Sequence, residues 1–440
     1  MKELTKQSQS NVKDNNLRLI LNTIIQNEPL SRADIVRSTQ ISKPTVSGLT
    51  DELIRRGIVS EIGMGHSQGG RKPILLHFNS TLKYFAAFEM GRVGYRIAIS
   101  DLKGTLLRKI DGEYSPEIGL RERLEMMRDD VLSLIEELSL GLKDILKIIC
   151  IAPGVYVEKG QEMKWYPATA GSARGTTERC EATEGSPSGR VPFGTTEGSA
   201  RGTTGDNEPE DMKAYFEDIF HHEVIFDHST KLSLLGEKMV GKARGYRNVL
   251  YIDFAYGLGC SFMINGNVYF GSNNSAGEIG YFYSSLDEFK SFTIVPYELG
   301  ALELNMSGFA LQKKAVEAIE GNEQNRINDL VQGDISRITA KTVFKAAMEG
   351  DRIAGNILKK SFRYFNMAFC NVINMLTPEV VILGGGFSNA GDFLLKLIED
   401  EIGDKVLMMP KLLISDLKNN ASIIGGVHYL IHRTDFLNEL

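Results

Sequence analysis

The first hydrophobic pattern in the chain is helical. Five apolar residues recur at the spacing of one buried helical face: Leu17, Ile20, Leu21, Ile24 and Ile25. Pro29 lies just beyond the predicted end of this helix. Ser31, followed three residues later by Asp34, has the spacing of a capping box and predicts the start of a second helix.

A third helix is predicted after a short turn at residues 39–41. Ser42 is placed to cap it, Pro44 suits its first turn, and Gly57 is placed to end it. Its inward-facing residues are Val46, Leu49 and Leu53. This spacing predicts a helix-turn-helix, in which the start of the last helix meets base edges. Lys43, Thr45 and Ser47 are therefore the candidate DNA-reading residues.

Two apolar stretches, 58–62 and 74–78, flank a glycine-rich segment that contains Arg71 and Lys72. This arrangement predicts the wing of a winged helix, and cations at its tip favour a narrow, electronegative minor groove. Arg55 and Arg56 are candidates for phosphate contacts or for pairing with the end of the helix dipole. A winged helix used for protein contact is the alternative reading.

Charge supports DNA binding by this part of the chain. Residues 1–80 contain 11 Lys and Arg against 7 Asp and Glu, a charge of +4, whereas the whole chain has a formal charge of -6. A basic module is thus attached to an acidic body. The polar start of the chain and the lack of a long apolar run predict a cytoplasmic protein without a membrane segment. The four separated cysteines predict free thiols.

From residue 84 onward, the pattern changes to strands that meet glycine turns. Residues 85–110 predict a hairpin and a third strand, and residues 148–160 predict a buried strand that meets Pro153-Gly154. Two further strands flank a glycine turn within 248–271, and residues 378–387 predict a strand that runs into three glycines. Turns of this kind bring backbone amides close to phosphates, but each one alone is a weak signal.

Taken together, and in this order with the AGEIG segment at residues 276–280, these elements resemble the ROK family over essentially the whole chain. The resemblance implies an α/β protein, an N-terminal winged helix-turn-helix followed by a two-lobed actin-like (ribonuclease H-like) ATPase fold. It places the DNA-binding domain at 1–80 and the body at 81–440. The small lobe would be 81–225 with a C-terminal helix at 421–440, and the large lobe 226–420. Family members that keep a winged helix are transcription regulators, and members without one are sugar kinases.

The phosphate-binding positions depart from the kinase pattern. Where kinases have Asp-x-Gly-Gly-Thr, residues 89–93 read EMGRV, so Arg92 and Val93 leave neither room nor a hydroxyl for ATP. The second turn, residues 255–259, reads AYGLG, with Tyr256 in the place of a small hydroxyl residue. The glycines at 384–386 remain, for phosphate or for close packing of a strand against a helix. We expect no nucleotide cofactor.

The resemblance also places the kinase catalytic base on Ser229, which cannot hold the proton of a sugar hydroxyl. His228 stands where the family has Asn. Asp227, two residues before Ser229, would share a strand face with it, and a shifted register would restore a base. We expect no catalytic residue and no enzyme activity. An ATP-dependent sugar kinase with an appended DNA-binding domain is the alternative.

The zinc ligands of the family are also missing. Tyr281 replaces the histidine, and Ile294, Pro296 and Ala301 replace three cysteines, so no metal is expected. The resemblance implies that Glu278 and Glu303 contact sugar, because carboxylates accept hydrogen bonds from paired hydroxyls. Tyr281 would stack on a sugar ring or be a buried structural tyrosine. Together with His228 and Ser229, these are the candidate ligand-binding residues.

Residues 168–207 match nothing in the family pattern and contain GSARGTT twice. Their composition predicts a disordered insertion, either a lid or a tolerated insertion. The sequence as a whole predicts a transcriptional regulator, most simply a repressor, controlled by a small carbohydrate. Its expected partners are double-stranded operator DNA, that carbohydrate and a second copy of the chain in a homodimer or a dimer of dimers. A body that binds no ligand and only dimerises remains a third reading.

Overall fold

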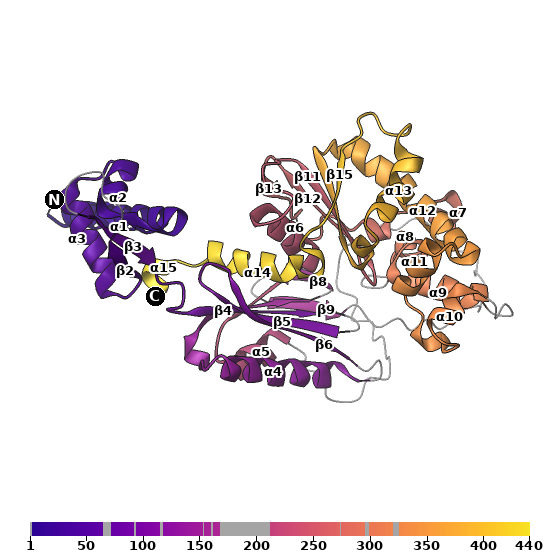
Figure 1. The fold of residues 1–440 in the computed structure, drawn as a ribbon, viewed down its shortest axis with the longest axis horizontal. Coiled ribbons are helices and arrows are strands. Elements are labelled where there is room, and N and C mark those ends of the chain that lie inside the picture. The colour runs from indigo at the N-terminus through magenta and orange to yellow at the C-terminus, as the bar shows by residue number, and fades with distance from the viewer. Residues whose placement is uncertain are drawn as a thin grey trace, which may run out of the picture.

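The computed structural model describes residues 2–64, 72–91, 94–114, 118–152, 154–159, 162–167, 212–272, 274–294, 299–319 and 325–440. Three units follow one another along its long axis (Figure 1). A small N-terminal domain lies at one end, and two α/β lobes follow it. The predicted insertion at 168–207 lies outside the described residues.

The N-terminal domain is a winged helix. Its helices are α1 (Lys2–Asn27), α2 (Arg32–Thr39) and α3 (Lys43–Arg55), and its strands are β1 (Leu30–Ser31), β2 (Val59–Met64) and β3 (Ile74–Phe78). The strands form a sheet in the order β1-β3-β2. Ser31 and Asp34 make the capping box expected at the start of α2, and Ser42 caps α3. The helix-turn-helix and the two wing strands predicted from the sequence are confirmed.

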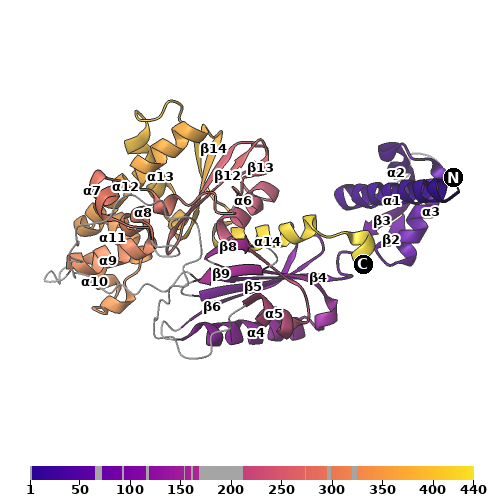
Figure 2. The same cartoon turned by 180° about the vertical axis from the view of Figure 1, so that it is seen from behind.

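The small lobe is built on a five-stranded sheet in the order β10-β7-β4-β5-β6. These strands are β4 (Tyr84–Met90), β5 (Gly94–Asp101), β6 (Leu106–Glu113), β7 (Ile145–Ile151) and β10 (Val224–Asp227). Helices α4 (Leu120–Glu137) and α5 (Met212–Phe220) cover one face, and α14 (Ala421–His432) covers the other (Figure 2). Strands β8 (Gly154–Lys159) and β9 (Glu162–Pro167) form a separate hairpin, and η1 (Leu142–Asp144) precedes β7.

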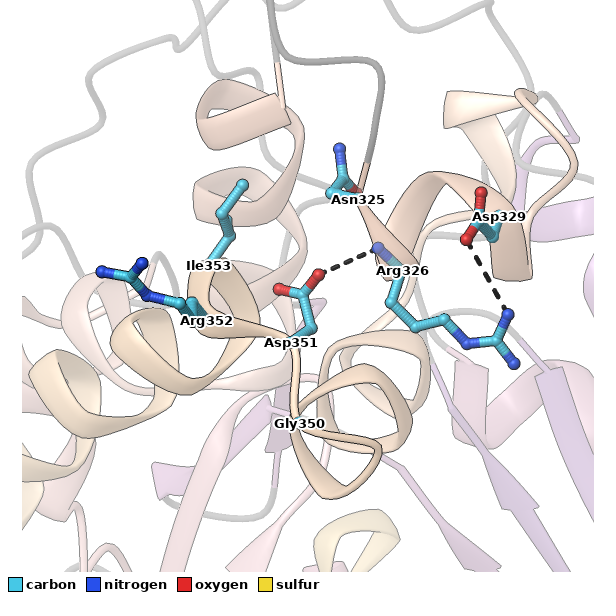
Figure 3. A pocket seen from close by; sticks show the side chains of 7 residues that line it. All are labelled: Asn325, Arg326, Asp329, Gly350, Asp351, Arg352 and Ile353. Carbon is cyan, nitrogen blue, oxygen red and sulfur yellow. Dashed lines mark hydrogen bonds and ion pairs between the residues drawn. The ribbon is translucent and has the colours of Figure 1, made fainter.

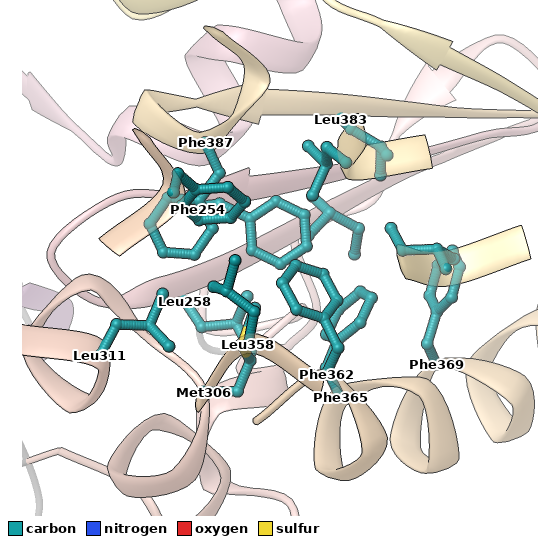
Figure 4. Packing of buried hydrophobic residues seen from close by; sticks show 14 of the residues in the cluster. Phe254, Leu258, Met306, Leu311, Leu358, Phe362, Phe365, Phe369, Leu383 and Phe387 are labelled. Atoms are coloured by element: carbon teal, nitrogen blue, oxygen red, sulfur yellow. The ribbon is translucent and has the colours of Figure 1, made fainter. Parts of the chain in front are cut away.

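The large lobe has a second five-stranded sheet, in the order β13-β12-β11-β14-β15. Its strands are β11 (Val249–Phe254), β12 (Leu258–Ile264), β13 (Asn267–Val268), β14 (Val380–Gly385) and β15 (Lys411–Ile414). Helix α6 (Ser229–Met239) packs on one face. The other face is covered by α9 (Gly308–Ile319), α11 (Ala340–Met348), α12 (Arg352–Leu376) and α13 (Asp392–Ile402). Phenylalanines dominate the core under this second face, including Phe254, Phe362 and Phe387 (Figure 4).

Short elements complete the large lobe and the C-terminus. They are η2 (Ile279–Tyr281), α7 (Leu286–Ser291), α8 (Ala301–Asn305), α10 (Arg326–Leu330), η3 (Ile335–Arg337), η4 (Gly386–Ala390), η5 (Lys418–Asn420) and α15 (Phe436–Glu439). The predicted lobe division after residue 225 crosses β10, which pairs with β7 through Asp227. We therefore propose that the small-lobe sheet ends at Asp227.

The C-terminal segment returns to the N-terminal domain. Helix α14 runs along the small-lobe sheet, and α15 then lies against the winged helix, where the figure marks the C-terminus (Figure 1). Buried residues of the winged helix, of the small-lobe sheet and of α14 belong to one hydrophobic cluster, which also contains Leu437. The DNA-binding domain and the small lobe thus share a continuous core.

Candidate functional site

The start of α3 presents the predicted DNA-reading residues. Lys43 and Ser47 are exposed, and Thr45 is half-buried. The Thr45 hydroxyl lies 2.8 Å from the hydroxyl of Ser42, so it takes part in the helix cap as well. Below them, Val46, Leu49 and Leu53 are buried and fix the helix against the domain core. The reading residues therefore stand on a rigid support, as groove recognition requires.

The wing begins from the paired strands β2 and β3, and Lys72 is exposed at its described edge. Arg71 lies outside the described residues. Arg56 makes a contact that the sequence did not predict. Its guanidinium donates a hydrogen bond to the carbonyl of Leu437 in α15, so it joins the winged helix to the C-terminal segment. Arg55 is exposed.

The turn at residues 255–259, which corresponds to a phosphate-binding turn of the kinases in the family resemblance, is occupied by contacts within the chain. The carbonyls of Ala255 and Tyr256 accept hydrogen bonds from Gly308 and Phe309, at 3.0 Å each. The Tyr256 and Phe309 rings also pack with centroids 5.7 Å apart. This aromatic pair occupies the turn where a kinase has a small hydroxyl residue. Arg92 and Val93 lie outside the described residues.

The glycines at the end of β14 are used for packing. A Cβ on Gly384 would lie 2.0 Å from the Tyr251 hydroxyl, and one on Gly385 would lie 2.3 Å from the Phe254 carbonyl oxygen. Gly385 also has a φ of 71°, in the left-handed region that favours glycine. Close packing against β11 therefore explains these two glycines without a phosphate.

Glu89, at the position of the kinase aspartate, accepts hydrogen bonds from Arg96 and from the Ser422 hydroxyl. Asp253 lies near it on β11. Burial, with a smaller effect from the negative charge of Glu89, raises the pKa of Asp253 to about 7. The Ser422–Glu89 hydrogen bond joins α14 to β4, and Asp253 places a second carboxyl from β11 close to this contact.

Glu278 and Glu303 are brought together where α8 packs on η2. A Cβ on Gly300 would lie 2.1 Å from the carbonyl oxygen of Gly280, which shows how closely these segments approach. Glu303 accepts hydrogen bonds from the backbone N–H groups of Leu258, at 2.8 Å, and Gly300, at 3.0 Å. Its carboxylate is thereby held in one orientation.

Part of the Glu278 side chain is accessible to solvent, although many protein atoms lie around its carboxyl group. Desolvation by that surrounding protein, followed by the negative charge of Glu303, raises the pKa of Glu278 to about 7. Tyr281 is half-buried at the end of η2. The two carboxylates and Tyr281 form an acceptor-rich group, which suits neutral hydroxyls.

The other predicted ligand residues lie at the start of α6. β10 ends at Asp227, and Ser229 is the first residue of α6, so the expectation that both share one strand face is wrong. The Asp227 carboxylate accepts a hydrogen bond from the His228 N–H at 2.7 Å, and burial raises the pKa of Asp227. Burial also lowers the pKa of His228 to about 3, so its imidazole is neutral at pH 7.

Sequence reasoning missed two residues that link these groups. Lys231 is 3% exposed, and its charge interacts with both Asp227 and Glu278. Tyr429, on α14, donates its hydroxyl hydrogen bond to Asp227. The position of Lys231 next to the apolar run at 232–235 is a signal that could have revealed it. Nothing in the sequence places Tyr429, about two hundred residues away, beside Asp227.

The segment that replaces the family's zinc site is held by packing. Ala301 is 2% exposed and begins α8, while Ile294 is exposed and Pro296 lies outside the described residues. Within the described ranges, no group of three or more His, Cys, Asp and Glu side chains is placed to hold a metal ion. In the same ranges, no helix is long and apolar enough to cross a membrane.

A separate groove of about 580 Å³ lies between α10 and the start of α12 (Figure 3). Asp351, Arg326 and Asp329, which line this groove, interact with neighbouring groups of the chain. Asp351 caps α12 and also accepts the N–H of Arg326 at 2.9 Å, and the Arg326 guanidinium contacts Asp329 and Glu349. This groove lies apart from the carboxylate group at Glu278 and Glu303, and it adds nothing to that site.

Comparisons with known proteins agree with this two-part organisation. The ROK family model matches residues 202–433, and a MarR family model matches residues 18–63. A putative xylose repressor of Caldicellulosiruptor sp. (strain Rt8B.4) is 27% identical over an alignment of 436 residues, and the alignment covers 96% of each chain.

Two solved structures share the fold. A ROK family transcriptional regulator, a homologue of the E. coli MLC protein, covers 96% of both chains with a TM-score of 0.66 and 21% identity. A ROK family glucokinase from Streptomyces griseus, in complex with glucose and AMPPNP, covers 79% of this chain and 98% of its own, with a TM-score of 0.59 and 17% identity. The expected actin-like body is confirmed. The ROK family model covers more than half of the 440 residues, so this chain is a member of the ROK family.

Proposed function

We propose that this protein is a DNA-binding transcriptional repressor whose body binds a small carbohydrate, and that the bound carbohydrate changes its affinity for an operator. One observation carries the proposal most directly. An exposed recognition-helix start stands on a winged helix whose core is continuous with the lobe that holds Asp227 and His228. The xylose-repressor name of a relative that matches 96% of this chain supports the same reading.

DNA would be read by two copies of the winged helix in a homodimer or a dimer of dimers. Lys43, Thr45 and Ser47 would enter the major groove, because the exposed start of α3 meets base edges in this type of domain. Lys72 and Arg71 would accompany the wing into the adjacent minor groove. A two-fold operator with half-sites one helical turn apart would match this symmetry.

The carbohydrate would bind between the start of α6 and the Glu278–Glu303 group. Both carboxylates would accept hydrogen bonds from sugar hydroxyls, and the neutral His228, Ser229 and Tyr281 offer further polar contacts. The charge of Lys231 interacts with Asp227 on one side of this site and with Glu278 on the other. A neutral polyol fits better than an anionic one on the carboxylate side, because two negative groups would repel it.

An ATP-dependent sugar kinase is the second candidate, favoured by the fold shared with a glucokinase. Against it, Ser229 stands at the position of the base, and Asp227 already holds hydrogen bonds from His228 and Tyr429. The aromatic pair of Tyr256 and Phe309 also fills one phosphate turn. We expect no transfer of labelled phosphate from ATP to any member of a sugar panel, and measurable turnover would favour the kinase.

The proposal is tested with the full-length protein. A binding duplex would first be selected from a randomised DNA pool, and sugars including xylose, glucose and N-acetylglucosamine would be screened by thermal shift. We expect a selected duplex to bind with a steep salt dependence, and at least one sugar to change that binding. A protein that binds no duplex at low salt, or whose DNA affinity no stabilising sugar alters, would contradict the proposal.

A further inference from the structure

A cavity of about 310 Å³ opens where α6, the β12–β13 hairpin and the end of α14 meet, a volume within the range of small-molecule pockets. Lys231, Leu235 and Lys238 line it from α6, and His432 and Arg433 line it from the α14 side. Lys231 lies at its buried floor, whereas His432 and Arg433 are exposed at its rim. Of the residues assigned to the proposed carbohydrate site, only Lys231 lines this cavity.

Its polar lining is basic. Four lining side chains carry or can accept a positive charge, and among the described residues that line the cavity none is a carboxylate: Lys231, Lys238, His432 and Arg433. The Lys231 ammonium donates to the backbone and side-chain oxygens of Asn274, and Lys238 donates to the carbonyl of Tyr246 at 3.0 Å. These acceptors are neutral. Asp227 and Glu278 offset part of the Lys231 charge, and the exposed Glu379 interacts with Lys238 from outside the cavity. Each ammonium carries three N–H donors, so it can also donate to a ligand.

Two carboxylates lie behind the cavity wall. Asp227 influences Lys231 and Arg433 but is only 4% exposed and accepts the Tyr429 hydroxyl, and Glu278 influences Lys231 alone. None of the carboxylates that act on these cations lines the cavity, so its polar lining is basic. Burial lowers the pKa of Lys231, so a negative group that entered beside it would oppose that effect and hold the ammonium charged.

The remaining wall is apolar. Leu235, Met263, Val268 and Phe270 line the same cavity, and Phe270 is 38% exposed. The Lys231 ammonium lies 5.5 Å from the centre of the Phe270 ring, so the basic floor and the aromatic wall adjoin each other. A ligand that satisfies both surfaces needs a negative group at one end and an apolar body at the other.

We propose that this cavity is a second ligand site, which binds a small organic anion with an apolar body, such as an aryl phosphate or an aryl carboxylate. The negative group lies among Lys231, Lys238 and Arg433, and the apolar body lies against Phe270 and Met263. The proposal stands on the cavity alone and does not depend on the proposed carbohydrate or DNA binding.

The probe is phenyl phosphate, titrated calorimetrically into the full-length protein. Inorganic phosphate and phenol are measured alongside it, because each retains only one half of the proposed recognition. We expect phenyl phosphate to bind at least about tenfold more tightly than either, and Arg433→Gln or Lys238→Gln to weaken it by about tenfold, the loss of one charge-assisted hydrogen bond. Two variants are needed because Arg433 also packs on the Tyr429 ring, 4.6 Å from its centre.

Two matched variants remove a cation elsewhere. Lys43→Gln removes an exposed charge from the DNA-reading helix, and Lys345→Gln removes one from α11. Both should bind phenyl phosphate as the wild type does. Glu278→Gln should bind it at least as tightly, because it removes a negative charge that acts on Lys231, and this result separates the cavity from the carbohydrate site. The proposal would be overturned if phenyl phosphate did not bind. It would also be overturned if Arg433→Gln and Lys238→Gln both bound it as tightly as the wild type, or if Lys43→Gln lost binding.

Discussion

Lys231 is a charged side chain in a buried position, and its surroundings explain why it is tolerated there. Its ammonium donates to the oxygens of Asn274, lies over Phe270 and is attracted by Asp227 and Glu278. A buried charge persists only when such partners offset its desolvation. Lys231 therefore ties the start of α6 to the segment that carries Glu278.

If Glu278 binds the carbohydrate as proposed, ligand binding should depend on pH. Its pKa of about 7 means that the carboxyl changes from protonated to ionised across neutral pH. Only the ionised form offers all its oxygen lone pairs to sugar hydroxyls. The affinity for a sugar identified by thermal shift should therefore fall about tenfold as the pH is lowered from 8 to 6, following the ionised fraction. Calorimetry across this pH range measures it.

In Glu278→Gln, the amide does not titrate, so the sugar affinity should be lower and nearly independent of pH. Glu317→Gln is the matched control, because this exposed glutamate lies on α9 and pairs only loosely with Lys313, at 4.0 Å. It should keep the wild-type profile. A pH dependence that survives in Glu278→Gln would assign the titration to another group.

Lys43 offers a test at the other end of the molecule. Because it is exposed at the first position of α3, Lys43→Ala should remove one contact with DNA while leaving the fold unchanged. We expect weaker binding to the selected duplex and a salt-dependence slope reduced by about 1 if the contact is to phosphate. Fluorescence anisotropy at several salt concentrations measures both, with Lys345→Ala as the control for a charge lost far from DNA.

Some residue roles could be predicted from the sequence because they depend on near neighbours. The Ser31–Asp34 capping box and the Ser42 cap are local, and both are present. Other roles depend on distant contacts. Arg56 meets the carbonyl of Leu437, and Tyr429 meets Asp227, so their functions required the folded chain.

At the scale of elements, α6 and α14 form the closest helix pair between the two lobes, and glycines permit their approach. A Cβ on Gly425 would lie 1.7 Å from the Leu232 carbonyl oxygen, and one on Gly236 would lie 2.4 Å from that of Ala421. Both contacts are with backbone, which cannot move aside as a side chain can. This pair therefore fixes how the lobes meet at the candidate site.

Gly425→Ala should force these helices apart. We expect it to lower the free energy of unfolding by about 3 kcal/mol or more, since overpacking against backbone has no side-chain rotation to relieve it. Gly355→Ala is the matched control in α12, because nothing lies within 4 Å of its added Cβ. That change should stabilise the protein by about 0.5–1 kcal/mol through helix propensity. Urea denaturation of both variants distinguishes them, and equal effects would contradict the packing argument.

The sequence predicted the β4–β5 and β11–β12 hairpins well, because their apolar runs and glycine turns are short-range patterns. For the C-terminal segment, the family resemblance placed one helix at 421–440 with the small lobe, whereas the structure has two helices, α14 and α15. Their residues form a helix by local preference, but the joining of α14 to the small-lobe sheet and of α15 to the winged helix depends on the whole topology. The start of α6 at Ser229 was also misjudged, because a strand and a helix there have similar apolar content.

In the whole molecule, the DNA-binding domain is attached to the small lobe at several points. Glu28 accepts hydrogen bonds or ion pairs from Lys103 in the small lobe and from His77 and the N–H of Phe78 in the wing strand. On the C-terminal side, Arg18 pairs with Asp435 at 2.5 Å, and the rings of Phe78 and Phe436 lie 5.5 Å apart. The winged helix is therefore expected to move with the small lobe.

This attachment suggests how a ligand would reach DNA. Asp227 at the candidate site is hydrogen-bonded to Tyr429 on α14, and Lys147 holds the carbonyl of Arg433 at 2.9 Å where α14 ends. Beyond it, α15 contacts the winged helix. A carbohydrate that repositions Asp227 would therefore bias the placement of α14, α15 and the DNA-reading helix together. Such coupling is a free energy shared by both sites, so it must be reciprocal.

Tyr429→Phe tests this route, because it removes the hydroxyl that joins α14 to Asp227 and keeps the ring against Arg433. In the wild type, saturating sugar should change DNA affinity by about 5- to 150-fold, and saturating DNA should change sugar affinity by the same factor. In Tyr429→Phe, we expect that factor to approach 1 while each ligand alone still binds. Anisotropy and calorimetry, each performed with and without the other ligand, measure the two sides of the cycle.

Tyr364→Phe on α12 is the control, since it removes a hydroxyl from the opposite side of the large lobe and should leave the coupling unchanged. If Tyr429→Phe couples the ligands as strongly as the wild type, α14 is not the connection. The signal would then have to pass through a movement of one protomer relative to the other. Such a movement would change the distance between the two winged helices, and therefore their fit to the two DNA half-sites, without involving α14.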